Sequence, residues 1–250
     1  PYTTLFRSIA CSKNLSFGFV DIPPVAPFIL SLNTALFGDS LFAVRLIPSL
    51  LSGVVVLLTG LMAKELGGGR FSVLLSSVAA ALVPVWMAVF STYTYDAFDQ
   101  CMVILLFYSF LRLVKSENPR VWLVIGLVAG LGILTKPSML FFIALFVLAV
   151  IITKHRKMLL TPWPYLGGLI TGVLLIPSFV WQLQNDFPIV QYWTSYSANK
   201  TVDAGILEYV IMQIVGTNLM LLPLWLMGLY RVLFDAQGKR YRIFGVVYIL

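Results

Sequence analysis

The stretch FAVRLIPSLLSGVVVLLTGLMA, residues 42–63, decides the class of fold. Its 22 residues include one charged side chain, that of Arg45. A helix rises 1.5 Å per residue, so a segment of this length reaches about 33 Å and can cross the hydrocarbon core of a bilayer. We therefore expect a membrane-spanning helix over this stretch.

The composition of the whole chain also indicates a membrane protein. Of its 250 residues, 60% are hydrophobic and 11% are charged, and the mean hydropathy is +0.94. Because soluble domains carry about 25% charged residues, this composition excludes a soluble globular enzyme. Two cysteines, Cys11 and Cys101, and a single histidine, His155, offer neither a disulfide framework nor the spacing of a metal site. They also argue against a Ser-His-Asp triad.

Further apolar runs of near-spanning length follow along the chain. Strands are excluded, because no ten-residue alternation of apolar and polar residues occurs. We predict an all-α, polytopic helical membrane protein with about seven spans and the start of an eighth. The expected spans are residues 42–63, 71–90, 97–114, 121–134, 139–153, 165–182 and 209–230, and the eighth begins at 243.

Charge alternates between the connections that join these spans. Four alternate connections hold 12 of the 17 basic residues and 3 of the 10 acidic ones. Lys and Arg accumulate in cytoplasmic loops, so we expect the acid-bearing face outside the cytoplasm and no nucleic-acid partner. The basic connections are residues 64–70, 112–120, 154–157 and 231–242. The acids outside them are Asp21, Asp39, Asp96, Asp99, Asp186, Asp203 and Glu208.

The first acid-bearing segment contains a short apolar stretch, residues 23–37, which ends at Gly38. Fifteen residues are few for a span. We expect a helix that lies along the membrane interface, with Asn33 and Thr34 turned toward water.

The expected spans 121–134 and 139–153 are each flanked by a basic loop, which predicts a hairpin that turns at residues 135–138. A helix of 14 residues reaches only about 21 Å. Lys136 should then lie below the outer surface, where an ammonium needs an anionic partner or a route to the surface. A lipid phosphate is one such partner.

Four other side chains are candidates for chemistry, and each has an ordinary structural alternative. Asp21 either caps the interfacial helix or belongs to a site. Asp96 and Asp99 share one face of the first turn of a helix. Either the helix dipole simply stabilises their negative charge there, or they serve in acid/base catalysis, cation binding or sugar recognition. Arg45 either extends to the membrane surface or forms a two-cation phosphate clamp with Lys136.

Five stretches, taken in order, resemble the polyprenyl-phosphate-sugar-dependent membrane glycosyltransferases of family 39 and its relatives. That group includes protein O-mannosyltransferases, lipid A aminoarabinose transferases and bacterial lipopolysaccharide-core transferases. The resemblance covers about residues 9–230 and is carried by GFVDIPPVAPFIL (18–30), LFGDSLFAVRLIPSLLSGVVVLLTGLMAKELGGGR (36–70), STYTYDAFDQ (91–100), GLVAGLGILTKPSMLFF (126–142) and IPSFVWQLQNDFP (176–188).

The resemblance implies the multi-spanning fold called GT-C and a multi-pass protein of the bacterial inner membrane. Such enzymes of the cell envelope take a hexosyl or pentosyl group from a polyprenyl-phosphate donor on the extracytoplasmic side. They pass it to a lipid, glycan or protein acceptor. The implied partners are this donor, the acceptor and membrane lipids. No cofactor is required by the resemblance, and a divalent cation stays open.

Roles carry over position by position. Asp21 matches the acidic residue of the first-loop motif, and either Asp96 or Asp99 matches the second outer acidic position. Lys136 matches the lysine that faces the carrier phosphate, and Arg45 matches an arginine in a Phe-Ala-x-Arg stretch.

The N-terminus departs from the family pattern. Relatives carry an Asp-Glu pair, the principal base, about five residues before the segment that corresponds to Ala10-Cys11, where this chain has Thr4-Leu5. We therefore expect residues 1–8 to be a foreign segment and residues 9–250 to be a transferase domain truncated at both ends. Such a fragment would hold the donor without turning it over.

Two rival hypotheses remain from the sequence: a membrane transporter or lipid flippase, and a non-enzymatic membrane scaffold. A transporter predicts repeat symmetry and charges near the middle of the bilayer. The transferase hypothesis instead requires Asp21 and an acid of the 96–99 pair to meet Lys136 in one cavity.

Overall fold

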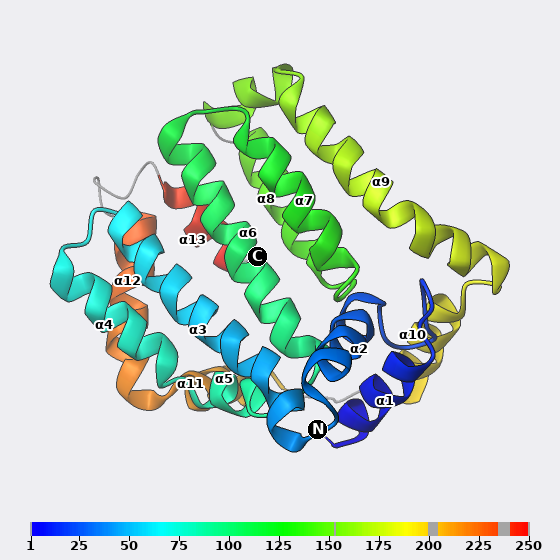
Figure 1. The fold of residues 1–250 in the computed structure, drawn as a ribbon. Helices are drawn as coiled ribbons and strands as arrows, with labels where there is room; N and C mark the ends of the chain where they lie inside the picture. Colours follow the sequence, from blue (N-terminus) through cyan, green and yellow to red (C-terminus); the bar gives the residue numbers. More distant parts are fainter. Residues whose placement is uncertain (1, 153, 200–204, 235–240, 250) are drawn as a thin grey trace.

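The computed structural model describes residues 2–152, 154–199, 205–234 and 241–249. Within these ranges every regular element is a helix (Figure 1), which confirms the all-α class. The helices are α1 (Tyr2–Lys13), α2 (Val25–Phe37), α3 (Leu41–Glu65), α4 (Arg70–Ala81), α5 (Pro84–Phe90), α6 (Tyr95–Ser116), α7 (Val121–Ile133), α8 (Met139–Ile152), η1 (Lys154–Leu160), α9 (Trp163–Gln184), α10 (Pro188–Asn199), α11 (Ile206–Thr217), η2 (Leu219–Leu221), α12 (Leu222–Phe234) and α13 (Arg242–Ile249).

Three helices of the described part, α3, α6 and α9, are long and apolar enough to cross a membrane. Two bent pairs raise this number to five if each counts as one span. The predicted number of about seven spans and the start of an eighth is therefore not confirmed. The short helices α7 and α8, of 13 and 14 residues, form the predicted hairpin.

Two segments that we predicted as continuous spans are broken. Residues 71–90 form α4 and α5, which meet at 61°. Pro84 begins α5, and Val83 before it is extended, because a proline ring disfavours helical backbone in the preceding residue. In the segment 209–230 the two parts meet at 94°, and Asn218 between them has a positive φ of 79°.

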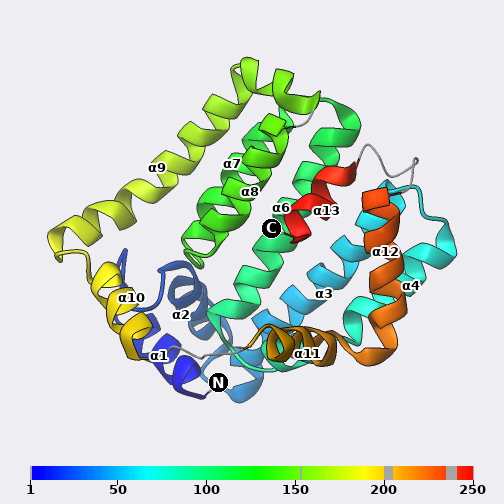
Figure 2. The ribbon, with the colours of Figure 1, turned by 180° about the vertical axis from the view of Figure 1, so that it is seen from behind.

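Helix α6 forms the centre of the bundle, with α3 on one side and α7 and α8 on the other (Figures 1 and 2). Phe110 of α6 stacks on Phe146 of α8 at 4.2 Å between ring centroids, and Phe107 meets the same ring edge-on at 4.7 Å. This aromatic core fixes the hairpin against α6, and so it fixes the turn that carries Lys136.

Helices α7 and α9 approach each other closely through glycines. A Cβ on Gly126 would lie 2.1 Å from the carbonyl oxygen of Gly167. The hydroxyl of Thr171 donates to the carbonyl oxygen of Gly126 at 2.7 Å. Small residues at helix crossings in membranes permit such backbone contact, and the crossing sets where the far end of α9 lies.

The apolar stretch 23–37 contains α2, which begins at Val25 and ends where Gly38 adopts a left-handed backbone with φ 77°. The expectation for Asn33 was wrong. Its side chain is buried and donates to the carbonyl oxygen of Ala43 at 2.6 Å, because the first turn of α3 packs against that face of α2. Thr34 is half-buried.

The predicted separation of charge is present at the two ends of α6. At its C-terminal end, Arg112 and Lys115 pair with Glu65 at the end of α3, at 2.7 and 2.8 Å. Close by in sequence, Arg120 lies over the ring of Trp163, 5.6 Å from its centroid. The basic connections around residues 64–70 and 112–120 therefore share one end of the bundle. Their cytoplasmic location stays a prediction.

Candidate functional site

The opposite end of α6 is built around Tyr93, just before the helix begins. Its phenol is buried and donates to the carbonyl oxygen of Ala26 at 2.6 Å. Burial raises the pKa of Tyr93, so the phenol remains a donor. In addition, the backbone N–H of Val25 donates to the carbonyl oxygen of Leu134 at 3.3 Å. These two bonds hold the start of α2 between the start of α6 and the α7–α8 turn.

The loop before α2 is held by a close contact with α9. A Cβ on Gly18 would lie 2.2 Å from the ring of Trp181, so only glycine allows this approach. Asp21 follows three residues later, and its carboxylate pairs with Arg7 of α1. It does not cap α2, because the N-cap position is Pro24 and no side chain caps this helix.

Lys136 lies between two carboxylates of α6. Its Nζ is 2.8 Å from Oδ1 of Asp96 and 3.6 Å from Oδ2 of Asp99, and it lies 5.7 Å from the centroid of the Tyr95 ring. The spacing of three residues places both acids on the face of α6 that meets the turn. Burial alone would lower the pKa of Lys136, but the hydrogen bond to Asp96 and the two negative charges outweigh it and raise the pKa.

The two acids differ in exposure. The side chain of Asp96 is 39% exposed, whereas that of Asp99 is 6% exposed. Oδ1 of Asp99 is buried and has no hydrogen-bond partner among the described residues. Asp96 can therefore exchange partners with solvent or substrate, whereas Asp99 is a buried carboxyl group beside the ammonium.

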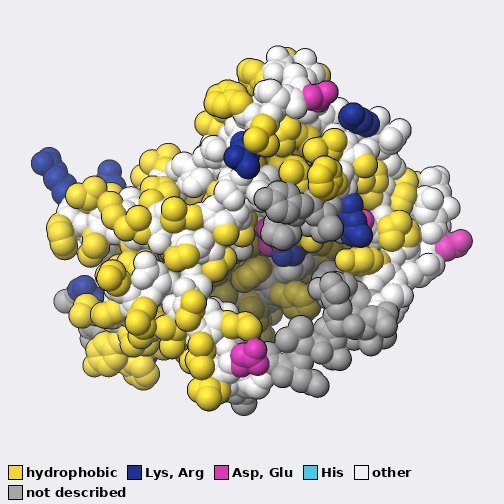
Figure 3. Space-filling model, turned by 90° about the horizontal axis from the view of Figure 1, so that it is seen from below, with side chains coloured by type: hydrophobic (Ala, Val, Ile, Leu, Met, Phe, Trp, Pro, Cys, Tyr) yellow, Lys and Arg dark blue, Asp and Glu magenta, His cyan; other side chains and the backbone are white. Residues whose placement is uncertain are grey.

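This cluster lies at a pocket of about 250 Å³. Seen from this end, the molecule has a central hollow with basic and acidic side chains at its floor (Figure 3). The pocket joins residues from four separate parts of the chain: Asp21, Pro23, Tyr95, Lys136, Pro137, Ile189 and Tyr192.

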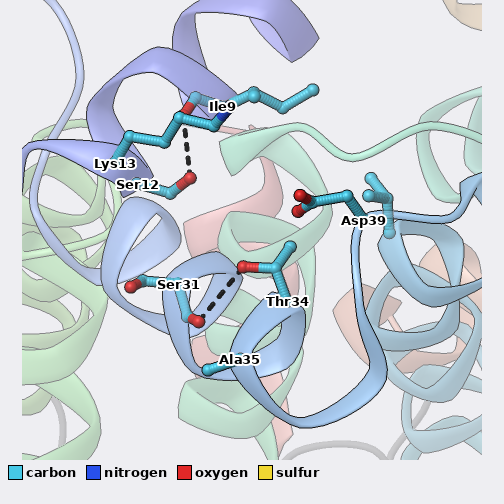
Figure 4. A pocket seen from close by; sticks show the side chains of 8 residues that line it. Ile9, Ser12, Lys13, Ser31, Thr34, Ala35 and Asp39 are labelled. Carbon is cyan, nitrogen blue, oxygen red and sulfur yellow. Dashed lines mark hydrogen bonds between the residues drawn. The ribbon is translucent and has the colours of Figure 1, made fainter.

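A second polar pocket, of about 530 Å³, lies between α1, α2 and the start of α3. Figure 4 shows the carboxylate of Asp39 and the hydroxyls of Ser12 and Thr34 around it. Both hydroxyls donate to backbone carbonyls of their own helices. Its charged side chains, Asp39 and Lys13, are exposed. It therefore lacks a partly buried ion pair such as that of Lys136, whose pocket we take as the candidate site.

The structure brings together most of the predicted site residues. Asp21 and Lys136 line one pocket, and Asp96 and Asp99 contact Lys136 from α6 without lining that pocket themselves. Arg45 is exposed on α3 and does not line this pocket, so the predicted two-cation clamp is not formed. The side chain of Thr4 lies outside the described residues, and the absence of the principal base stays a prediction.

Sequence reasoning missed five residues that line the pocket: Pro23, Tyr95, Pro137, Ile189 and Tyr192. Tyr95 adjoins a predicted site acid and Pro137 adjoins Lys136, so both could have been found by proximity. Ile189 and Tyr192 gave no such signal. Among the described residues, no group of three or more His, Cys, Asp or Glu side chains could hold a metal ion.

The fold and the pocket define a helical membrane protein in which a lysine ammonium lies among carboxylates at one end of the helix bundle. Residues 21–181 match the model of the dolichyl-phosphate-mannose-protein mannosyltransferase family. This match covers more than half of the chain, and the chain belongs to that family. The family consists of glycosyltransferases that use a lipid-linked sugar donor. Searches of curated proteins and of solved structures gave no match.

Proposed function

We propose that this protein transfers a sugar from a polyprenyl-phosphate donor to a hydroxyl of a lipid, glycan or protein acceptor on the extracytoplasmic face of the membrane. The observation that carries the proposal is the position of Lys136, whose ammonium lies in a pocket between Asp96 and Asp99. Family membership favours transfer over the transporter and scaffold alternatives.

Lys136 is the group that binds the phosphate of the donor in this proposal. The ammonium can donate three hydrogen bonds, and its bond to Asp96 occupies only one of them. A phosphate that enters the pocket replaces Asp96 or shares the ammonium with it. Asp99 stays beside the lysine during this exchange, because its side chain is buried and its Oδ2 lies 3.6 Å from Nζ of Lys136. Arg45 contributes no contact here, so the phosphate role rests on Lys136.

The reaction follows from the same arrangement. The acceptor hydroxyl attacks the anomeric carbon, the bond from this carbon to the phosphate oxygen breaks, and the polyprenyl phosphate leaves with the bonding electrons. Lys136 stabilises the charge that develops on the leaving phosphate. The proton of the hydroxyl passes to a carboxylate. Because Thr4-Leu5 stands where relatives carry their principal base, the proposal gives this role to Asp96, the more accessible of the two acids beside the lysine, in contrast to the expectation that the chain cannot turn the donor over.

The test uses the full-length protein in lipid vesicles with a radiolabelled polyprenyl-phosphate sugar. Lys136→Ala should lower transfer at least about 100-fold, as expected when a charged group that stabilises the leaving group is lost. Lys64→Ala, an exposed lysine at the end of α3, is the matched control and should leave transfer unchanged. Unchanged transfer in Lys136→Ala would refute the proposal.

A further inference from the structure

One wall of the Lys136 pocket comes from outside the segment that defines the family. The family match ends at residue 181. Ile189 and Tyr192 belong to α10 and line the same pocket as Tyr95 and Lys136. The family segment therefore supplies the charged floor of the pocket, whereas α10 supplies side chains that complete its apolar wall.

The turn between α9 and α10 is held by several specific contacts. Asp186 and Phe187 are consecutive non-glycine residues with left-handed backbone, at φ 59° and 52°. Such residues are costly and persist only where surrounding contacts impose them. The backbone N–H of Phe187 donates to the carbonyl oxygen of Gln182 at 2.8 Å. The side-chain amide of Gln191 donates to the backbone carbonyl oxygen of Asp186 at 3.0 Å.

Because of this turn, α10 leaves the direction of α9 and lies on the side of α1 and α2 in both ribbon views (Figures 1 and 2). The ring of Phe187 also packs edge-on against Phe179 of α9, at 6.1 Å between centroids. The strained backbone is thus fixed from both sides of the turn. Its consequence is that Ile189 and Tyr192 reach the pocket.

The pocket has the chemistry of a site for a single sugar ring next to a phosphate. Its walls are the rings of Tyr95 and Tyr192 with Ile189 and two prolines, and its charged groups are Lys136 and Asp21. A sugar has apolar C–H faces that pack on aromatic rings and a polar rim that hydrogen-bonds to phenols and carboxylates. A volume of about 250 Å³ lies below the range of drug-sized pockets, which fits one monosaccharide rather than an oligosaccharide.

We propose that Tyr192 packs against the sugar ring of the donor, opposite the phosphate held by Lys136, and that α10 thereby selects the sugar. This inference rests on the proposed function and deepens it. It assigns the phosphate to the family segment and recognition of the monosaccharide to α10. Tyr192 is a specificity-determining residue in this assignment, and Tyr95 provides the second aromatic ring.

The test measures equilibrium binding to the full-length protein in lipid nanodiscs, by displacement of radiolabelled decaprenyl phosphate. The competing probes are decaprenyl phosphate itself and its mannosyl, arabinosyl and N-acetylglucosaminyl esters. In the wild type, at least one ester should bind more tightly than decaprenyl phosphate. Tyr192→Ala should lower the affinity for that ester about tenfold, the usual scale for truncating a packed aromatic side chain. Its affinity for decaprenyl phosphate should stay within about twofold.

Two further variants complete the test. Tyr192→Phe keeps the ring and should retain most of the preference for the ester. Ile189→Trp makes the pocket smaller and should weaken binding of the esters but not binding of decaprenyl phosphate. In both cases the affinity for decaprenyl phosphate reports that the protein is folded. The inference is overturned if no ester binds more tightly than decaprenyl phosphate, or if Tyr192→Ala weakens every probe equally.

The same measurements separate this inference from the proposed function. Lys136→Ala should weaken decaprenyl phosphate and its esters alike. If Lys136→Ala weakens binding of neither probe class, the phosphate role of Lys136 fails whatever the effect of the Tyr192 variants. If it weakens both while Tyr192→Ala changes nothing, the phosphate role stands and the role of α10 fails.

Discussion

The two ends of α6 each carry a lysine paired with a carboxylate at the same distance, yet the pairs do different things. Lys115 lies 2.8 Å from Glu65, and Lys136 lies 2.8 Å from Asp96. At the Lys115 end Arg112 also pairs with Glu65, so two cations share one acid. At the Lys136 end two acids share one cation beside a pocket. The ion pairs join two helices in the first setting, and in the second we propose that they keep an ammonium beside the pocket for an incoming anion.

The largest difference between the two ends should appear when each lysine is removed. Lys136→Ala is expected to abolish transfer of the labelled sugar. Lys115→Ala should leave transfer within about twofold and should lower the free energy of unfolding by at most about 1 kcal/mol, because exposed ion pairs contribute little. Transfer assays and thermal unfolding of both variants check this contrast. Equal losses of transfer would mean that the ends are not functionally distinct.

The next largest effect distinguishes the two acids beside Lys136. Asp96→Asn should lower transfer about 100-fold with little change in thermal stability, because the accessible carboxylate receives the proton. Asp99→Asn should instead lower the free energy of unfolding by about 1–3 kcal/mol, since it removes a buried partner of a charged group. Circular dichroism melts and transfer rates measured together provide the check. A melting temperature unaffected by Asp99→Asn would contradict the role of this acid as a buried partner of Lys136.

A smaller effect is expected where the loop with Asp21 meets α9. Gly18→Ala places a methyl group 2.2 Å from the Trp181 ring and should destabilise the protein by about 1–3 kcal/mol through overpacking. Gly53→Ala is the matched control, because a Cβ there meets nothing within 4 Å. Comparison of the two melting temperatures tests the contact. If the control melts as early as Gly18→Ala, the loop is not held as described.

The smallest expected effect is the pH dependence of anion binding at Lys136. Burial alone would lower the pKa of this lysine, but Asp96 and Asp99 raise it above its ordinary value of about 10.4, so its charge contributes fully to anion binding at lower pH and is lost as pH rises through the raised pKa. Binding of decaprenyl phosphate should therefore show no loss from lysine deprotonation up to about pH 10. In Asp96→Asn the loss should begin at lower pH. A titration of binding against pH in both proteins is the measurement.

Much of the fold could be predicted because hydropathy acts locally. The long apolar runs predicted α3, α6 and α9, and the basic loops around the 121–153 region predicted the α7–α8 hairpin. The breaks were missed where a single residue overrides the apolar pattern. Pro84 disfavours helical backbone in Val83, and Asn218 takes a positive φ within an otherwise apolar segment.

The candidate site divides in the same way. Lys136 was predicted from its depth in a short hairpin, and Asp96 and Asp99 from their helical spacing. Arg45 was predicted to join them, but no local signal could show that its position on α3 keeps it out of the pocket. Tyr192 was missed for the converse reason. It reaches the pocket through a strained turn that hydropathy does not report.

The sequence by itself determined a helical membrane protein with most of its basic residues in one set of alternate connections and most of its acids outside them, because span length and the distribution of charge are properties of short segments. Only the tertiary structure decided which acids share the ammonium of Lys136, which acid is buried, and which side chains of α10 complete the pocket. Those outcomes depend on contacts between segments 67 to 163 residues apart, such as Tyr93 against Ala26 and Gly18 against Trp181. Contacts of this kind follow from close packing rather than from periodicity.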